Sequence, residues 1–151
     1  MRFKKITTWI VLADGARARV LRNDGPGTGL AELEEWVSEE ARKPTRELGV
    51  ERPGRVQESA NAERHAMAPR EDWHEQEKTN FARDLARYLK KHGDDGDYDE
   101  LILAAAPRAL GDLRKSLDQA TAGRLKSEIN KDLTQIPIAE LDSHLSDVIR
   151  L

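Results

Sequence analysis

Cysteine is absent from all 151 residues, so disulfide bonds and thiolate metal ligands are excluded. No apolar run approaches the roughly 20 residues that a membrane-spanning helix needs, and no signal-peptide pattern follows the basic start Met1–Lys5. The net charge of −3 gives no overall field that favours nucleic acid. These absences predict a cytoplasmic protein that does not contact a membrane.

Apolar residues are present in clusters rather than spread through the chain. Hydrophobic residues make up 38% of the sequence and charged residues 35%. A chain of this length can bury a useful core as one folded unit. We therefore expect a single domain over residues 1–151, of undetermined oligomeric state.

The clearest local signal lies in residues 8–21, where two strand-like runs flank Asp14 and Gly15. Asp-Gly between such runs is typical of a tight hairpin turn, with positive φ at both central residues. The first run is apolar on both faces, which indicates a central strand covered on both sides. Asp14 has a second interpretation, as a catalytic carboxylate near a metal pair, but no second acid on a core strand is evident.

Arg17 and Arg19 share one face of the second strand-like run, because alternate side chains of a strand point the same way. Two interpretations are open for this face. The arginines bind RNA, or they pair with carboxylates such as Glu32 and Glu34, and the structural pairing is favoured.

The rest of the chain predicts alternating elements. The first is a strand over 30–38, for which a helix is the open alternative, and a long loop over 40–72 follows it. After the loop come a helix that starts near Glu71 and carries Trp73 to Leu89, a strand over 98–105, a helix from Pro107, an edge strand over 124–132 and a helix from Pro137. The order β-β-β-long loop-α-β-α-β-α predicts an α/β fold, with a mixed sheet of about five strands and helices packed on it.

The long loop is the feature that most favours a functional role, because long loops in compact domains are uncommon. Residues 41–70 carry seven basic and four acidic side chains, a balance of +3 that falls to +1 when the window extends to Asp72. Arginine donors suit phosphate contacts, although a solvated loop is the simpler interpretation. The candidate contacts for RNA or the ribosome are Arg52, Gly54, Arg55, Gln57, Arg64 and His65.

Other candidates are weaker. Arg108 follows Pro107 at a strand-to-helix junction, where it either completes an anion site or lies beside simple helix initiation. Thr134 is a candidate cap of the last helix. The four histidines have no ligand-like spacing, so no metal is expected, and no motif predicts a cofactor.

Several motifs together resemble the bacterial host attachment protein family, which is named for a requirement in attachment to host cells. The resemblance spans nearly the whole chain in order. It is carried by Trp9 to Val20, Pro53 to Arg55, Glu63 to Met67, Phe81 to Leu85, Tyr98 to Arg114 and Ile129 to Thr134.

The resemblance implies a fold like the RNase H-like middle domain of archaeo-eukaryotic peptide-chain release factors. In those factors a loop after the third strand carries Gly-Gly-Gln, whose glutamine promotes ester hydrolysis on the ribosome. Here the matching loop holds Gly54-Arg-Val-Gln57, which lacks the second glycine and its backbone freedom. The chain also lacks room for the other release-factor domains, so termination activity is not expected.

Three functions follow as hypotheses. The first is a non-enzymatic, translation-associated module that contacts the ribosome or RNA through residues 41–70. The alternative is an interaction protein with a protein partner that acts indirectly in attachment to host cells or surfaces. The least favoured is a hydrolase that uses Gln57 or Asp14.

Overall fold

The computed structural model describes residues 5–38 and 60–151, with the backbone alone for residues 60–74. One five-stranded sheet has the order β3-β2-β1-β4-β5. Its β1–β2 and β2–β3 pairs are antiparallel, whereas β1–β4 and β4–β5 are parallel. The α/β class with a mixed five-stranded sheet is therefore confirmed. The strands are β1 (Thr8–Ala13), β2 (Arg17–Asn23), β3 (Ala31–Val37), β4 (Glu100–Ala105) and β5 (Leu125–Ile129).

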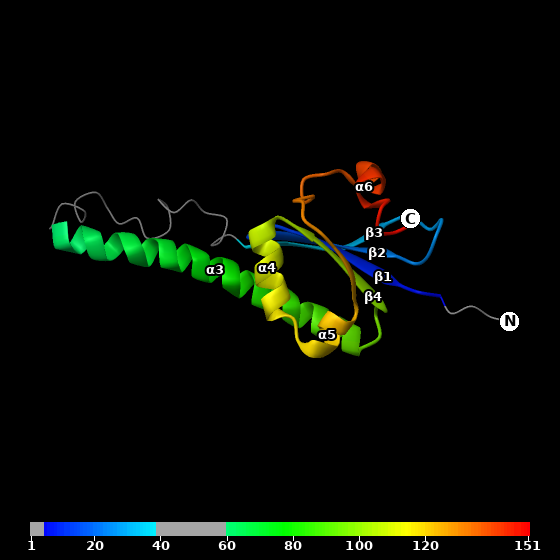
Figure 1. The fold of residues 1–151 in the computed structure, drawn as a ribbon, viewed down its shortest axis with the longest axis horizontal. Coiled ribbons are helices and arrows are strands. Elements are labelled where there is room, and N and C mark those ends of the chain that lie inside the picture. Colours follow the sequence, from blue (N-terminus) through cyan, green and yellow to red (C-terminus); the bar gives the residue numbers. More distant parts are fainter. Residues whose placement is uncertain (1–4, 39–59) are drawn as a thin grey trace.

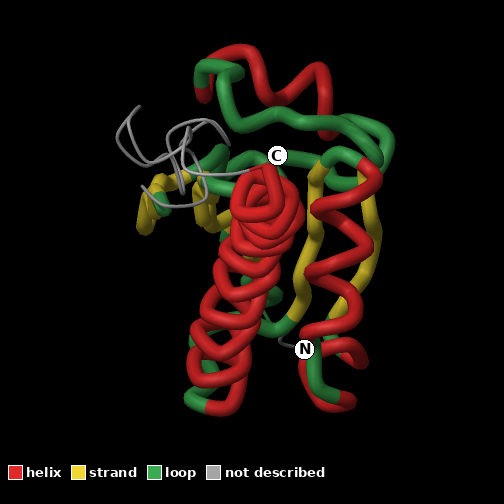
Figure 2. Tube along the Cα trace, turned by 90° about the vertical axis from the view of Figure 1, so that its left-hand side faces the viewer, coloured by secondary structure: helices red, strands yellow, loops and turns green. Residues whose placement is uncertain are grey.

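Helices cover both faces of this sheet (Figures 1 and 2). They are α3 (Ala60–Asp94), α4 (Pro107–Ser116), α5 (Gln119–Gly123) and α6 (Ile138–Leu145). One core lies between the sheet and α3 with α4, and contains Phe81, Leu85, Leu110 and others. The second core lies on the opposite face, where α6 and the flanking C-terminal segment pack.

The central strand β1 serves both cores because its side chains alternate between the two faces. Trp9 and Val11 point into the core under α3, whereas Ile10 and Leu12 point into the core under α6. All six residues of β1 are buried. The prediction of a central strand covered on both sides is confirmed.

Two predictions about helices were wrong. Helix α3 begins at Ala60, so the predicted loop over 40–72 ends earlier, and Pro69 lies inside the helix. Pro69 lacks an amide N–H and costs one backbone hydrogen bond, but the alanine-rich sequence around it has high helix propensity. Helix α5 was missed because five residues are too few to show a helical period. Asp118 starts it by accepting a hydrogen bond from the Thr121 amide at 2.9 Å.

The hairpin between β1 and β2 turns by a different mechanism from the expected one. In the described part of the chain, positive φ occurs only at Gly25, Gly27, Gly29 and Gly96. The prediction of positive φ at Asp14 and Gly15 was therefore wrong. The connection has three residues instead of two. Oδ1 of Asp14 accepts hydrogen bonds from the amides of Ala16 and Arg17, each at 2.7 Å, and these bonds hold the turn.

Gly93, near the end of α3, is needed for close approach rather than for its backbone conformation. A Cβ atom there would lie 2.8 Å from Oη of Tyr98 and would also collide with the guanidinium of Arg124. Tyr98 is only 2% exposed, so it has little room to move. We expect Gly93→Ala to lower the free energy of unfolding by about 1–2 kcal/mol, measured by urea denaturation.

Gly111→Ala is the matched control, because Gly111 lies inside α4 and a Cβ there would meet nothing within 4 Å. Alanine has the higher helix propensity, so this variant should gain up to about 1 kcal/mol. Equal effects of the two substitutions would contradict the steric argument.

Candidate functional site

The connection between β3 and α3 carries most of the residues predicted to bind RNA. Arg52, Gly54, Arg55 and Gln57 lie outside the described residues. Arg64 and His65 lie in the first part of α3 and not in a loop. The sequence placed these residues together in one segment, and the structure divides the segment between the connection and the helix.

Helix α3 is much longer than the surface on which it packs. Among the residues of α3 whose side chains the structure describes, which start at Glu75, the first buried one is Phe81. From Ala60 to Phe81 the helix rises about 30 Å, at about 1.5 Å per residue. Figure 1 shows the N-terminal part of α3 running well past the sheet and α4. The helix therefore holds Arg64 and Arg70 away from the body of the protein.

Arg108 lies at the start of α4, directly after the carboxyl end of β4. Its guanidinium contacts the carboxylate of Glu75 on α3, so this pair links the two helices. Ala106 precedes the helix without a side-chain cap, and no acidic residue lies in the first turn. An anion at this helix end would have to compete with Glu75 for Arg108.

Arg19 joins the sheet to the C-terminal segment. Its Nε donates to Oε1 of Glu32 at 3.1 Å, and its Nη1 donates to the carbonyl oxygens of Thr134 at 3.3 Å and Ile136 at 2.7 Å. The predicted pairing with Glu32 is confirmed. Glu34 instead lies on the other face, where its charge contributes to raising the pKa of Tyr88, after the larger effect of burial.

The segment around Thr134 has a structural role that the sequence alone did not reveal. Oδ1 of Asp132 accepts hydrogen bonds from the Thr134 amide at 2.9 Å and from its hydroxyl at 2.6 Å. Leu133 between them is buried in the core under α6. The prediction that Thr134 caps the last helix was therefore wrong. Pro137 holds the cap position there, with no side-chain bond.

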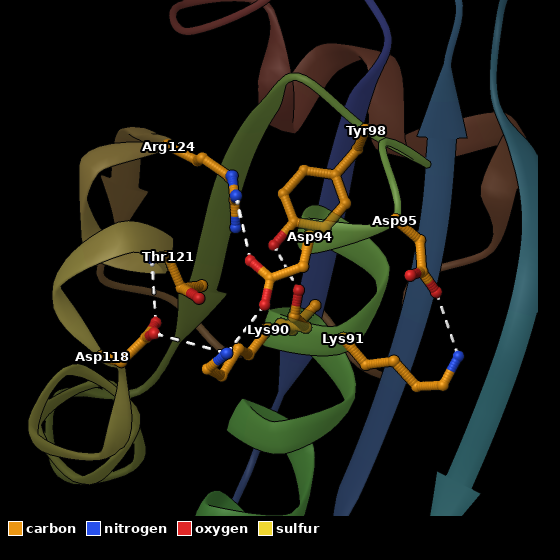
Figure 3. A network of polar contacts seen from close by, with 9 residues as sticks. Lys90, Lys91, Asp94, Asp95, Tyr98, Asp118, Thr121 and Arg124 are labelled. Carbon is orange, nitrogen blue, oxygen red and sulfur yellow. Dashed lines mark hydrogen bonds and ion pairs between the residues drawn. The ribbon is translucent and has the colours of Figure 1, made fainter.

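A network of charges links the end of α3 to α5 (Figure 3). Nζ of Lys90 lies 2.7 Å from Oδ2 of Asp94, and Nη2 of Arg124 lies 3.3 Å from Oδ1 of the same residue. The hydrogen bond from Lys90, and then that from Arg124, lower the pKa of Asp94. Hydrogen bonds from Thr121 lower the pKa of Asp118. Exposed pairs of this kind contribute little stability.

Aromatic rings pack where β1 meets the end of α3. The ring of Trp9 lies 5.8 Å from that of Tyr88 and 5.2 Å from that of His92, centroid to centroid. Nδ1 of His92 lies 2.6 Å from Oδ2 of Asp97. Burial raises the pKa of Tyr98, whose hydroxyl donates to the Leu89 carbonyl at 2.6 Å. These contacts fix the helix on the sheet.

The described residues do not form a metal site, because no three of their histidine, aspartate or glutamate side chains are suitably grouped. Asp14 uses its Oδ1 atom to hold the hairpin, which is the role of a turn residue. None of the helices in the described part of the chain is both long and apolar enough to cross a membrane.

Comparison with known proteins gives a family for this chain. A family model described as "Protein required for attachment to host cells" matches residues 9–145. None of the curated proteins compared matches the chain. Among solved structures, the chain is similar to the crystal structure of an archaeal translation termination factor, with 13% sequence identity and a TM-score of 0.48. The match covers 93% of this chain and 38% of that one.

Proposed function

The chain belongs to the family of proteins required for attachment to host cells, and within that family we propose that it is a non-enzymatic, translation-associated binding module. It contacts RNA on the ribosome through residues 41–70. The observation that carries this proposal is the charge of that segment, which has seven basic and four acidic side chains in a chain of net charge −3.

The position of the segment supports the same proposal. It ends in the part of α3 that extends past the sheet, and Arg64 and Arg70 belong to that part of the helix. Guanidinium groups donate paired hydrogen bonds to phosphate oxygens, and such contacts supply most of the sequence-independent affinity for RNA. The sheet and its two cores then act as the scaffold.

Cosedimentation of the purified protein with ribosomes tests this proposal. We compare the wild type with a variant in which Arg52, Arg55 and Arg64 are all changed to alanine. Three phosphate contacts should make the affinity fall about 20- to 40-fold when salt rises from about 50 to about 200 mM. The triple variant should lose most of both the binding and its salt dependence.

The matched control changes three exposed arginines outside the segment, namely Arg83, Arg87 and Arg150. This control removes the same charge and should bind ribosomes nearly as the wild type does. Loss of binding in both variants would mean that net charge alone is responsible. An absence of binding at every salt concentration would overturn the RNA proposal.

The family description favours a second candidate function, an interaction protein that acts indirectly in attachment to host cells or surfaces. This function predicts a protein partner and no affinity for RNA. The test is attachment of a strain that lacks the gene, complemented by the wild type or by the triple arginine variant. Full complementation by the variant would separate attachment from the basic segment.

A further inference from the structure

An open pocket of about 290 Å³ lies at one corner of the sheet, on the face that α6 covers. β2 and β3 form its floor, and the segment from Thr134 to Pro137 forms one wall. Four charged side chains line it, namely Arg17, Arg19, Glu32 and Glu35. This pocket lies in the described part of the chain and shares no residue with segment 41–70.

Two of the four charges are already matched within the protein. Arg19 donates to Glu32 and to the carbonyl oxygens of Thr134 and Ile136, which uses both its Nε and Nη1 atoms. Arg19 is 8% exposed, so this arrangement is fixed. The pair of Arg19 and Glu32 therefore forms a rigid side of the pocket.

The other two charges have no partner in the described part of the chain. Nε of Arg17 is buried without any hydrogen bond, which is a costly state for a charged donor, whereas the residue as a whole is half-buried and lines the pocket. Neither Arg17 nor Glu35 forms an ion pair with any residue that the structure describes. The pocket thus offers one cation and one anion to a ligand.

We propose that this pocket binds a free α-amino acid as a zwitterion, with its carboxylate on Arg17 and its ammonium group on Glu35. The strand register supports this arrangement. Glu35 lies opposite Arg19 and Val37 lies opposite Arg17, so Arg17 and Glu35 are diagonal neighbours on one face. Diagonal positions have their backbones about 7–8 Å apart, so the long side chains of Arg17 and Glu35 can reach the two ends of one small ligand.

The charges also select against other small ligands. A phosphate would gain Arg17 but would lie near the carboxylates of Glu32 and Glu35, which repel it. An amine alone would leave Arg17 unsatisfied. Ile136 and Pro137 line the same pocket and offer carbon atoms to an apolar side chain. L-Leucine is therefore the first probe, and the proposal does not depend on RNA binding.

Titration of the purified full-length protein with L-leucine, followed by backbone amide shifts in NMR, tests the proposal. Acetate, propylamine and inorganic phosphate are titrated in parallel. We expect saturable shifts at β2, β3 and the Thr134–Pro137 segment with leucine, and binding at least about tenfold weaker with each of the other three probes.

Two variants and two controls identify the contacts. Arg17→Gln and Glu35→Gln should each weaken leucine binding at least about tenfold. Arg87→Gln and Glu34→Gln should not, because Arg87 is an exposed residue of α3 and Glu34 lies on the opposite face of the sheet. The amide spectra also show whether each variant is folded.

Three results would overturn the proposal. One is the absence of shifts with leucine. Another is acetate or phosphate binding as tightly as leucine with no effect of Glu35→Gln, which would mean that the pocket takes a simple anion. The third is unchanged leucine binding in both folded variants.

Discussion

Changing Arg19 to alanine is expected to lower the free energy of unfolding by about 3 kcal/mol. The substitution removes hydrogen bonds to two carbonyl oxygens, those of Thr134 and Ile136, and leaves both without this donor. It also unpairs Glu32, whose side chain is 40% exposed and so loses little. Most of the effect should therefore come from release of the segment after β5.

Urea denaturation followed by circular dichroism measures this change, and two further variants separate its causes. Glu32→Gln tests the ion pair alone and should cost less than about 1 kcal/mol. Arg19→Lys keeps the charge but lacks the planar guanidinium that bonds Glu32 and the two carbonyl oxygens together. Its loss in free energy of unfolding should therefore lie between the losses of Arg19→Ala and Glu32→Gln. If Arg19→Ala cost no more than Glu32→Gln, the carbonyl contacts would have no energetic role.

The second large effect is expected at Leu85, which lies on α3 and is fully buried against the sheet. Truncation to alanine leaves a cavity in the core between α3 and β1, so the expected loss is about 3 kcal/mol. Since α3 carries Arg64 and Arg70 of the proposed RNA contact, its docking fixes where this part of the contact lies. The free energy of unfolding is again measured in urea.

Leu117→Ala is the control, because Leu117 packs against the same core but is only partly buried. It should cost clearly less than Leu85→Ala, since less apolar area returns to water. Ribosome binding of Leu85→Ala, measured well below its unfolding transition, should match that of the wild type. Equal losses at the two leucines would show that the face of α3 towards the sheet is loosely packed.

The sequence predicted most of the fold because its strongest signals were local. Apolar runs on both faces identified β1 and β4, and Pro107 marked the start of α4. Period-two alternation identified β5 as an edge strand, which the sheet order confirms. Each of these features depends on neighbours in the chain and needs no knowledge of distant contacts.

Two errors arose where a local signal had a second solution. Pro69 predicted an end to helical structure, but the surrounding alanines carry α3 through it. Asp14-Gly15 predicted a two-residue turn, but the carboxylate of Asp14 binds two amides and holds a three-residue connection. In both cases neighbouring side chains stabilised a backbone conformation other than the one that the local signal predicted.

The amino-acid pocket could not be predicted because it depends on contacts between distant segments. Arg19 and Thr134 are 115 positions apart in the chain and meet only when the C-terminal segment crosses the sheet. The sequence did place Arg17 and Arg19 on one strand face, and it suggested Glu32 as a partner. It did not indicate that Arg17 and Glu35 would stay unpaired, because that depends on the contacts that Arg19 and Glu32 make in the folded protein.

The strand order has a consequence for how the protein folds during synthesis. β1 pairs with β2 across a three-residue turn, but its other edge waits for β4, where Thr8 meets Glu100. Closing a loop of this length is slow, so the hairpin and β3 form while the second edge of β1 is still open. That edge belongs to a fully buried apolar strand and is a template for wrong pairing until β4 leaves the ribosome. A nascent chain that pauses before β4 has emerged from the ribosome is therefore expected to be prone to aggregate.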